Sequence, residues 1–194
     1  MFKYIISIFL LSVLIISCES DKLPIPKPPT YLRLNLPEHQ YELFSDDCPY
    51  QFEAAKIFKI RQVTEEGKLT CHKDIDLGPL NGVLHFSYID MVNPIGDYIN
   101  FAIDKVDEHK VKATAIEDTL IIRPDAKVYG TFFELQGDVA SPFQFYLTDS
   151  VSRFVSGVIY FNSAPKYDSL KPSLDYLKKD LYHMMNTFQW KPKK

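Results

Sequence analysis

The stretch "AKVYGTFFELQGDVASPFQFYLTDSVSRFVSGVIYFN" (residues 126–162) decides the fold, because it predicts three consecutive strands. Aromatic and β-branched residues concentrate in three runs, at residues 126–136, 141–150 and 153–162. Turn-forming pairs separate these runs, namely Gly137-Asp138 and Asp149-Ser150. Strands joined by such short turns pair with their neighbours in the opposite direction. The stretch therefore predicts an antiparallel meander.

A helix is predicted after the meander, because apolar residues there recur every three or four positions. Pro172 suits the first turn of this helix, where its missing N–H costs nothing. The apolar residues that follow fall within an arc of about 100° at 3.6 residues per turn. They are Leu174, Leu177, Leu181, Met184, Met185 and Phe188. We expect this arc to pack across the sheet, with residues 188–190 closing an edge.

Upstream of the meander, the sequence predicts mostly extended structure and one further helix. Alternating residues favour strands at 31–36 and 82–90, and residues 41–76 are expected to be extended, with a turn at 65–68. Apolar residues at helical spacing predict an amphipathic helix from Asp97 to about His109. Residues 112–124 are interpreted as a hairpin with its turn near Glu117-Asp118.

Together these elements predict a single globular α+β domain over residues 31–190. An antiparallel sheet is flanked by an early helix and by a C-terminal helix. The final order of three strands, a helix and a short Phe/Trp segment resembles the Mog1/PsbP-type α/β/α sandwich. This resemblance implies a fold and says nothing about function.

The N-terminal stretch "LIISCES" (residues 14–20) predicts export and lipidation. Lys3 precedes an apolar run at residues 5–16, which is shorter than the roughly 20 residues that a spanning helix needs and fits a secretory signal. Ile15-Ile16-Ser17-Cys18 resembles a bacterial lipobox, in which the cysteine becomes the acylated N-terminus. We therefore expect a signal peptide at 1–17 and acyl chains on Cys18. The alternative is an ordinary cleaved signal with an incidental cysteine.

The segment after Cys18 is predicted to be a tether. Four prolines fall within residues 24–29, and they exclude a helix or a central strand. Residues 18–30 are therefore expected to hold the lipid anchor and a tether, in which residues 19–30 form a semi-rigid polyproline spacer of roughly 35–40 Å, at about 3.1 Å per residue. The basic tail at 191–194 is expected to be a solvated terminus.

Composition and charge exclude one class of partner. The 194 residues hold 22 Lys+Arg against 25 Asp+Glu, and no long basic run is present. A mildly acidic chain without a basic patch has no electrostatic footprint for nucleic acid. We therefore expect no nucleic-acid partner.

Two cysteines remain beside Cys18. Cys48 and Cys71 form an even pair in an exported protein, which favours a disulfide. The alternative is a metal site formed by these two cysteines and His72. The sequence has no CxxC pair and no second ligand pair at zinc spacing, so the disulfide is the preferred prediction.

Catalytic motifs are missing from the sequence. It contains no GxSxG elbow, no phosphate-binding loop, no GxGxxG after a strand and no HExxH. We expect no catalytic residues, no resident metal and no cofactor. The densest polar group lies in residues 141–150, where Gln144, Tyr146 and Thr148 alternate onto one face. This row is typical of a recognition surface or of a buried line of hydrogen bonds.

Several stretches together resemble the gliding-motility lipoprotein GldD family of Bacteroidetes. They are "RLNLPEHQY" (33–41), "CPYQFE" (48–53), "SYI" (87–89), "HKVKATAI" (109–116), "VYGTFFELQGDVASPFQFYLTDS" (128–150) and "GVIYFNSAPKYDSL" (157–170). The lipobox at Cys18 agrees with this family. "CHKDIDL" departs from it, because His72 stands where we expect an aromatic residue.

The resemblance implies a non-enzymatic cell-envelope protein that is needed for gliding, within machinery associated with type IX secretion. Its partners would be other envelope proteins of that machinery, and its lipid anchor would hold it facing the periplasm. Only Cys18 carries over as a functional residue. The candidate partner surface is the face with Gln144, Tyr146 and Thr148, continued by Asp149 and Ser150.

Two alternatives stay open. The first is a lipoprotein that captures a small molecule or a glycan at the membrane surface, in a pocket hidden between helix and sheet. The second is a hydrolase with scattered catalytic residues. A pocket with converging titratable groups would favour these alternatives, whereas a closed domain with an exposed patch would favour the interaction protein.

Overall fold

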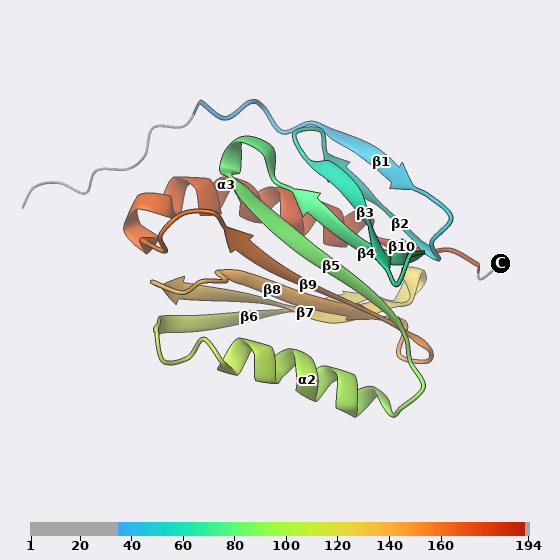
Figure 1. Ribbon diagram of the computed structural model, residues 1–194. Helices are drawn as coiled ribbons and strands as arrows, with labels where there is room; N and C mark the ends of the chain where they lie inside the picture. The colour runs from blue at the N-terminus through green and yellow to red at the C-terminus, as the bar shows by residue number, and fades with distance from the viewer. Residues whose placement is uncertain (1–34, 193–194) are drawn as a thin grey trace, which may run out of the picture.

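The computed structural model describes residues 35–192 (Figure 1). The predicted signal peptide, Cys18, the tether and residues 193–194 of the basic tail lie outside the described residues. The predicted strand at 31–36 is described only at Asn35 and Leu36, and neither residue is part of a strand. Pro37 follows them directly and has no N–H for a ladder. The first strand instead begins at Tyr41.

A seven-stranded antiparallel sheet forms the middle of the domain (Figure 1). The meander predicted for residues 126–162 is confirmed as three adjacent strands. Across the sheet the order is β3 (Lys59–Glu65), β4 (Lys68–Asp76), β5 (Gly82–Asp90), β9 (Arg153–Phe161), β8 (Phe143–Thr148), β7 (Val128–Gly137) and β6 (Ala113–Arg123).

The backbone confirms the two predicted turns of the meander and the turn predicted at 65–68. Gly137 has φ of 110° and Ser150 has φ of 64°, at the two turns of the meander. Glu66 and Gly67 both have positive φ between β3 and β4. Positive φ at both central residues is the geometry that matches the twist of a two-residue hairpin.

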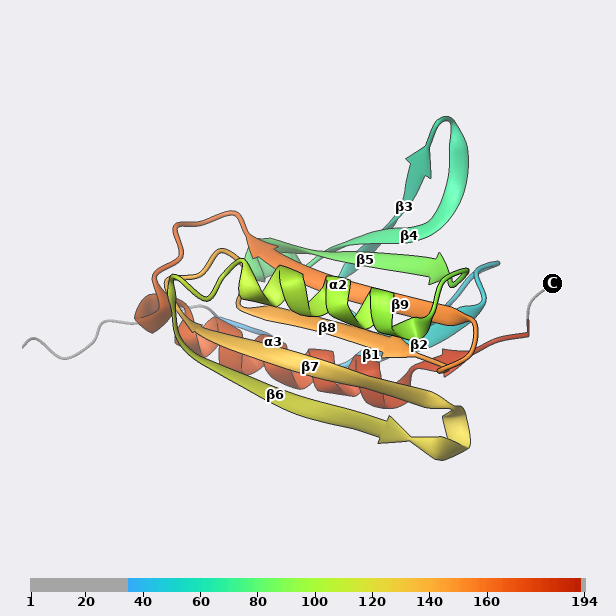
Figure 2. The same ribbon diagram turned by 90° about the horizontal axis from the view of Figure 1, so that it is seen from below.

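Two helices lie on opposite faces of the main sheet (Figures 1 and 2). Helix α2 (Ile95–Asp107) covers one face, here called the outer face, and α3 (Tyr167–Thr187) covers the other. A second sheet lies beside α3 in the order β1 (Tyr41–Ser45), β2 (Tyr50–Ala55) and β10 (Gln189–Trp190). Two 3-10 helices, η1 (Gly78–Leu80) and η2 (Pro124–Ala126), complete the elements. The α+β prediction is therefore confirmed.

The main core lies between the seven-stranded sheet and the layer of α3 with the small sheet. The predicted apolar arc of α3 is buried along its whole length, from Leu174 to Phe188. Phe86 and Phe145 of the sheet and Phe52 of the small sheet meet it in one cluster. Fully burying side chains of this size stabilises a fold by about 1.5–3 kcal/mol each.

Helix α2 packs much more loosely than α3. Val106 is its only buried residue, and it joins a small cluster with Leu135 and Val139. Phe101 on the same helix is 58% exposed. The outer face of the sheet is thus only partly covered. Neither helix in the described part of the chain is long and apolar enough to span a bilayer.

The predicted hairpin at 112–124 is wrong. Residues Ala113–Arg123 form one strand, β6, which pairs with β7 along its length and has no turn at Glu117-Asp118. Because β6 is an edge strand of the sheet, these two charged residues are exposed without breaking it. Charged side chains on an edge protect it against unwanted strand pairing.

The predicted start of the C-terminal helix is also wrong. Helix α3 begins at Tyr167, so Pro172 lies inside it rather than in its first turn. The helix has no capping hydrogen bond from its own N-cap residue. Instead Asp138 Oδ1, from the loop between β7 and β8, accepts a hydrogen bond of 3.1 Å from the Tyr167 N–H. A tertiary contact therefore supplies the cap that starts the helix early.

Candidate functional site

The row of polar residues on β8 lies on the outer face of the sheet. Gln144 is 3% exposed and sits under α2, with its Nε2 3.5 Å from the carbonyl oxygen of Lys105. Tyr146 is half-buried, accepts a hydrogen bond from Thr131 Oγ1 and stacks on Phe154. The row does not form an open surface, because neighbouring elements cover most of it.

The continuation of this row builds the turn between β8 and β9. Thr148 Oγ1 donates to the Arg153 carbonyl at 2.7 Å and accepts from the Ser150 N–H at 3.0 Å. Asp149 Oδ1 accepts hydrogen bonds from three backbone N–H groups that follow it in the chain, those of Val151, Ser152 and Arg153. Ser150 is exposed, whereas Thr148 and Asp149 are buried. A partner could reach Ser150 here, but not the other two without movement.

Asp149 is held as a carboxylate by this turn. Burial alone would raise its pKa, but the Ser152 N–H, the Arg153 side chain and the other backbone N–H groups lower the pKa to about 2. Arg153 Nε lies 2.8 Å from Asp149 Oδ2, and Arg153 also donates to the Lys191 carbonyl. The residues therefore have a structural task in joining β8, β9 and the C-terminal segment.

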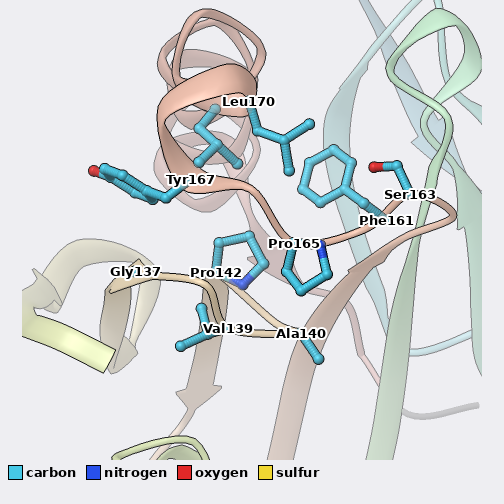
Figure 3. Close-up of a pocket in the computed structure, with 10 residues that line it drawn as sticks. Gly137, Val139, Ala140, Pro142, Phe161, Ser163, Pro165, Tyr167 and Leu170 are labelled. Carbon is cyan, nitrogen blue, oxygen red and sulfur yellow. The ribbon is translucent and has the colours of Figure 1, made fainter. Parts of the chain in front are cut away.

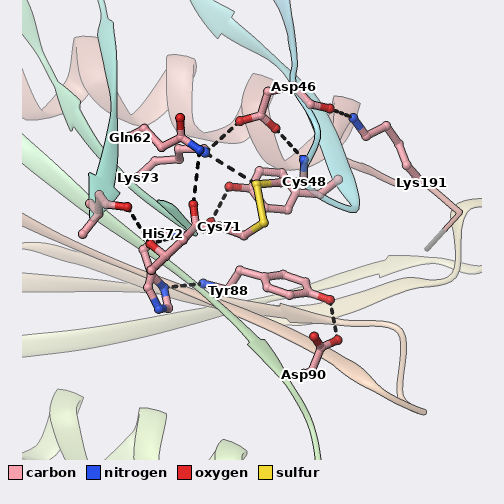
Figure 4. The surroundings of a disulfide bond; sticks show 12 residues. Asp46, Cys48, Gln62, Cys71, His72, Lys73, Tyr88, Asp90 and Lys191 are labelled. Atoms are coloured by element: carbon pink, nitrogen blue, oxygen red, sulfur yellow. Dashed lines mark hydrogen bonds and ion pairs between the residues drawn. A yellow bond between two sulfur atoms is a disulfide. The ribbon is translucent and has the colours of Figure 1, made fainter. Parts of the chain in front are cut away.

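The predicted disulfide between Cys48 and Cys71 is confirmed (Figure 4). It links the loop before β2 to β4, with a Cα–Cα distance of 5.5 Å. Both sulfurs are used in the bridge, so the alternative metal site with His72 is not formed. Lys73 Nζ lies 2.7 Å from Asp46 Oδ2 and 3.5 Å from Cys48 Sγ, although Lys73 is 1% exposed.

His72 serves the backbone of the neighbouring strand. Its Nδ1 accepts a hydrogen bond of 3.1 Å from the Tyr88 N–H, just beyond Lys73 and Phe86, where the pairing of β4 with β5 ends (Figure 4). An imidazole nitrogen that accepts in this way carries no proton. His72 thus extends the pairing of the two strands where an aromatic residue would leave the N–H without this partner.

A cavity of 180 Å³ lies between α2 and the outer face of the sheet. Its walls are mostly apolar and its polar groups are few, which is typical of ligand sites. The helix side contributes Phe101, Ala102 and Lys105. The strands contribute Ser87, Phe133, Gln144, Phe145, Ser156, Gly157 and Val158.

An open cleft of 330 Å³ adjoins this cavity and shares Ser87, Phe101 and Ser156 with it. Two pairs of a histidine with a carboxylate line the cleft. His85 Nδ1 lies 2.7 Å from Asp74 Oδ1, and His72 Nε2 lies 3.7 Å from Glu65 Oε1. The cleft runs along the outer face toward the hairpin of β3 and β4, which rises away from the sheet (Figure 2).

A third hollow, between the β7–β8 loop and the start of α3, is too small for a ligand (Figure 3). Val139, Pro142, Phe161, Pro165 and Leu170 surround a volume of only 10 Å³. A water molecule needs about 10–15 Å³ measured in this way. Within residues 35–192, no group of three or more His, Cys, Asp or Glu side chains is placed to hold a metal ion.

The cavity beneath α2 was not predicted from the sequence in detail. The sequence indicated an amphipathic helix and a hydrogen-bonding row, but not that they face each other. One signal was present: Phe101 interrupts the polar side of α2, opposite the buried Val106. The small residues Ser87 and Ser156 leave room below Phe101. They lie side by side because β5 pairs with β9.

The fold defines an α+β domain, and the sequence motif at Cys18 predicts that the domain is carried on a lipid-anchored envelope protein. The residues 21–190 match the family described as gliding motility lipoprotein GldD, and the chain belongs to this family. Membership gives the protein a role in gliding motility and a membrane-anchored location in the cell envelope. The family resemblance noted in the sequence is thereby confirmed.

Comparison with solved structures gave the solution structure of PsbP (CyanoP) from Synechocystis sp. PCC 6803. The identity is 9% and the TM-score is 0.47, and the match covers 84% of this chain and 99% of that chain. Comparison with curated proteins gave no match.

Proposed function

We propose that this protein is a non-enzymatic interaction component of the gliding and type IX secretion machinery of Bacteroidetes. The family match over residues 21–190 carries the proposal. Cys18 would bear the acyl chains, since more than one chain is needed for stable anchoring. The tether at 18–30 would hold the domain in the periplasm, where it stabilises other envelope proteins of the machinery.

The chemistry of the outer face supports a non-catalytic role. The Asp74–His85 pair has the spacing of two members of a catalytic triad, but neither Ser87 nor Ser156 hydrogen-bonds to His85 in the described residues. An activated nucleophile and its base are normally about 2.6–3.2 Å apart. His85 is 52% exposed at its side chain, so it lies in solvent rather than in a dry site.

The edge strand β6 supports a role in binding another protein. Leu120 and Ile122 lie two residues apart on it, on one face, and are 65% and 63% exposed. Exposed apolar side chains beside an unpaired strand edge are a common feature of protein-binding surfaces. We call Leu120 and Ile122 the β6 edge pair.

Deletion of the gene in its own organism, with complementation, tests the proposal. We expect loss of gliding and of protein export on deletion, with rescue by the wild-type chain but not by Cys18→Ala at equal abundance. A deletion strain that glides and exports normally would refute the role.

Two point variants, Ile122→Asp and His85→Asn, then separate an interaction role from a catalytic one, with Val111→Asp as the control. Ile122→Asp should impair gliding, because it places a charge in the β6 edge pair, whereas Val111→Asp should not, since Val111 is 95% exposed and lies in a loop. His85→Asn, which removes the one base of the Asp74 pair, should also leave gliding intact. Loss of gliding with His85→Asn at normal abundance would favour the hydrolase alternative.

The cavity beneath α2 favours a second candidate function, the capture of a ligand at the membrane surface. The cavity has a volume of 180 Å³ and mostly apolar walls with a few polar groups, which is typical of ligand sites. Ligand capture and machine assembly are compatible, because a bound ligand can position the domain within the envelope.

A further inference from the structure

The cavity beneath α2 contains a buried polar side chain that is only weakly paired. Gln144 is 3% exposed, and its only side-chain hydrogen bond in the described structure is the long one of 3.5 Å to Lys105. A carboxamide that is held by one long hydrogen bond at the wall of a cavity can exchange that bond for shorter ones to a ligand.

Two hydroxyl groups lie near this carboxamide. Ser87 on β5 and Ser156 on β9 are direct partners in the strand register, and both line the cavity. Neither hydroxyl has a hydrogen-bond partner in the described part of the chain. Each can donate one hydrogen bond and accept two. The site therefore offers neutral donors and acceptors in one small area.

The charged group at the cavity is already engaged. Lys105 Nζ lies 2.7 Å from Glu108 Oε1 on the same helix, which satisfies its charge at the rim. The other lining residues are neutral. An anionic or cationic ligand would lose hydration here without gaining an opposite charge. These walls therefore favour a neutral ligand.

The walls select a ligand with one apolar face. Phe101 stands at the opening with 58% of its surface exposed, and Phe133 lines the interior from β7. Phe101 also lines the open cleft, so the same ring borders both hollows. A sugar ring has a face of C–H groups that stacks on an aromatic ring, and hydroxyl groups around its rim.

We propose that this cavity binds an N-acetylated hexosamine unit of a cell-envelope glycan. The acetamido group has one donor, its N–H, and one acceptor, its carbonyl oxygen. These complement the carbonyl oxygen and the NH₂ group of the Gln144 carboxamide. Its methyl group packs among the phenylalanines, and the ring hydroxyls reach Ser87 and Ser156. The 180 Å³ volume is below the roughly 300–1,000 Å³ of drug-sized sites, so it takes a single ring rather than a long chain. This inference rests on the second candidate function.

A peptide is a poorer fit for the same site. Peptides are usually held by backbone hydrogen bonds to a free sheet edge. Here the floor is formed by β5, β9 and β8, which lie inside the sheet and pair on both sides. The polar groups that remain are side-chain hydroxyls and one carboxamide, which match a sugar.

Isothermal titration of the full-length lipoprotein in detergent tests the proposal, with triacetylchitotriose as the probe and cellotriose as the control without acetamido groups. We expect triacetylchitotriose to bind with a Kd of about 0.1–1 mM and cellotriose at least about tenfold more weakly, a ratio equal to about 1.4 kcal/mol. Equal binding of both sugars, no binding of either, or preferential binding of an acetylated tripeptide would overturn the proposal.

Variants locate the binding. Phe101→Ala and Gln144→Leu should each weaken binding of triacetylchitotriose at least about tenfold, and Phe101→Ala should fold normally because it is exposed. Leu43→Ala is the matched control, since Leu43 is 63% exposed on β1, away from the cavity. Unchanged binding in Phe101→Ala would place the sugar elsewhere and overturn the proposal.

A competition arm identifies the source of the sugar. Muramidase fragments of the cell wall and purified surface polysaccharide are each tested for displacement of triacetylchitotriose. Displacement by either supports the proposal and names the source, and displacement by neither contradicts it. These outcomes are independent of gliding, so a failure here leaves the role in the motility machinery untouched.

Discussion

Lys73 Nζ lies 2.7 Å from Asp46 Oδ2, and the lysine is 1% exposed while the aspartate side chain is 29% exposed. The pair is therefore unequal in burial. The Phe44 ring, 5.9 Å from Nζ, and Cys48 Sγ complete the surroundings of the ammonium group. A charge in such a site depends strongly on its counter-charge, here the Asp46 carboxylate.

The first prediction follows from this inequality. Asp46→Asn keeps the acceptor for the Cys48 N–H but leaves the Lys73 charge buried and unpaired, so it should lower the free energy of unfolding by about 3 kcal/mol. Lys73→Met should cost at most about 1 kcal/mol, because Asp46 can turn to water. Urea unfolding of both variants measures the difference. Equal costs would show that the buried charge is stabilised by other groups.

The second prediction concerns the disulfide. The bridge closes a loop with a sequence separation of 23, so the double variant Cys48→Ala/Cys71→Ala should lose about 3 kcal/mol of unfolding free energy. Reduction of the wild-type protein should produce a similar loss. Denaturant unfolding with and without a reductant checks this. The double variant itself should not respond to the reductant.

The third prediction is a pH dependence centred on Asp149. Its pKa falls from 3.8 to about 2 on folding, so its carboxylate stabilises the fold above about pH 4, and that stability is lost as the pH falls toward 2. Asp149→Asn should cost about 2 kcal/mol at pH 7. Its deficit relative to wild type should shrink as the pH falls from 4 to 2.

Denaturant unfolding at several pH values measures this deficit. Asp175→Asn is the matched control, because Asp175 pairs with Lys171 on the surface of α3 and is 58% exposed. Surface pairs of this kind contribute at most about 1 kcal/mol. A deficit of Asp149→Asn that stays constant with pH would contradict the assignment of the low pKa to this turn.

The fourth prediction concerns the segment that enters the domain. His39 Nδ1 lies 2.6 Å from Asp180 Oδ1, and Asp180 is 1% exposed with its other oxygen unpaired among the described residues. His39→Ala should cost about 3 kcal/mol, since it strips a buried carboxylate of its partner. His39→Ala/Asp180→Leu should recover most of that loss.

Hydrogen exchange of residues 35–40 gives an independent measurement. Exchange should accelerate in His39→Ala, because the segment loses its contact with α3. His85→Ala is the control, since its partner Asp74 is at a similar distance but partly exposed, and should cost about 1 kcal/mol or less. Similar costs for His39→Ala and His85→Ala would contradict the prediction.

Local patterns predicted most of the elements, for reasons visible in single segments. The alternation in residues 82–90 is the period of a half-buried strand, and β5 has these bounds. The apolar arc from Leu174 to Phe188 has the period of a helix, and it is buried. These patterns persist because each depends on residues that are close together in the sequence.

The two errors in the fold arose where a distant residue decides the outcome. Glu117-Asp118 resembles a turn, but the pairing with β7 holds these residues in an edge strand. Pro172 resembles a helix start, but Asp138 caps the helix five residues earlier, at Tyr167. No local signal reveals either partner.

The candidate site divides in the same way. The sequence by itself determined the lipobox at Cys18, the pair Cys48 and Cys71, and the polar row on β8, because these depend on residue type and spacing. Only the tertiary structure decided that Gln144 is covered by α2, that Ser87 lies beside Ser156, and that Lys73 is buried against Asp46. Burial and proximity depend on which strands pair and on how tightly a helix packs, and these are properties of the whole sheet.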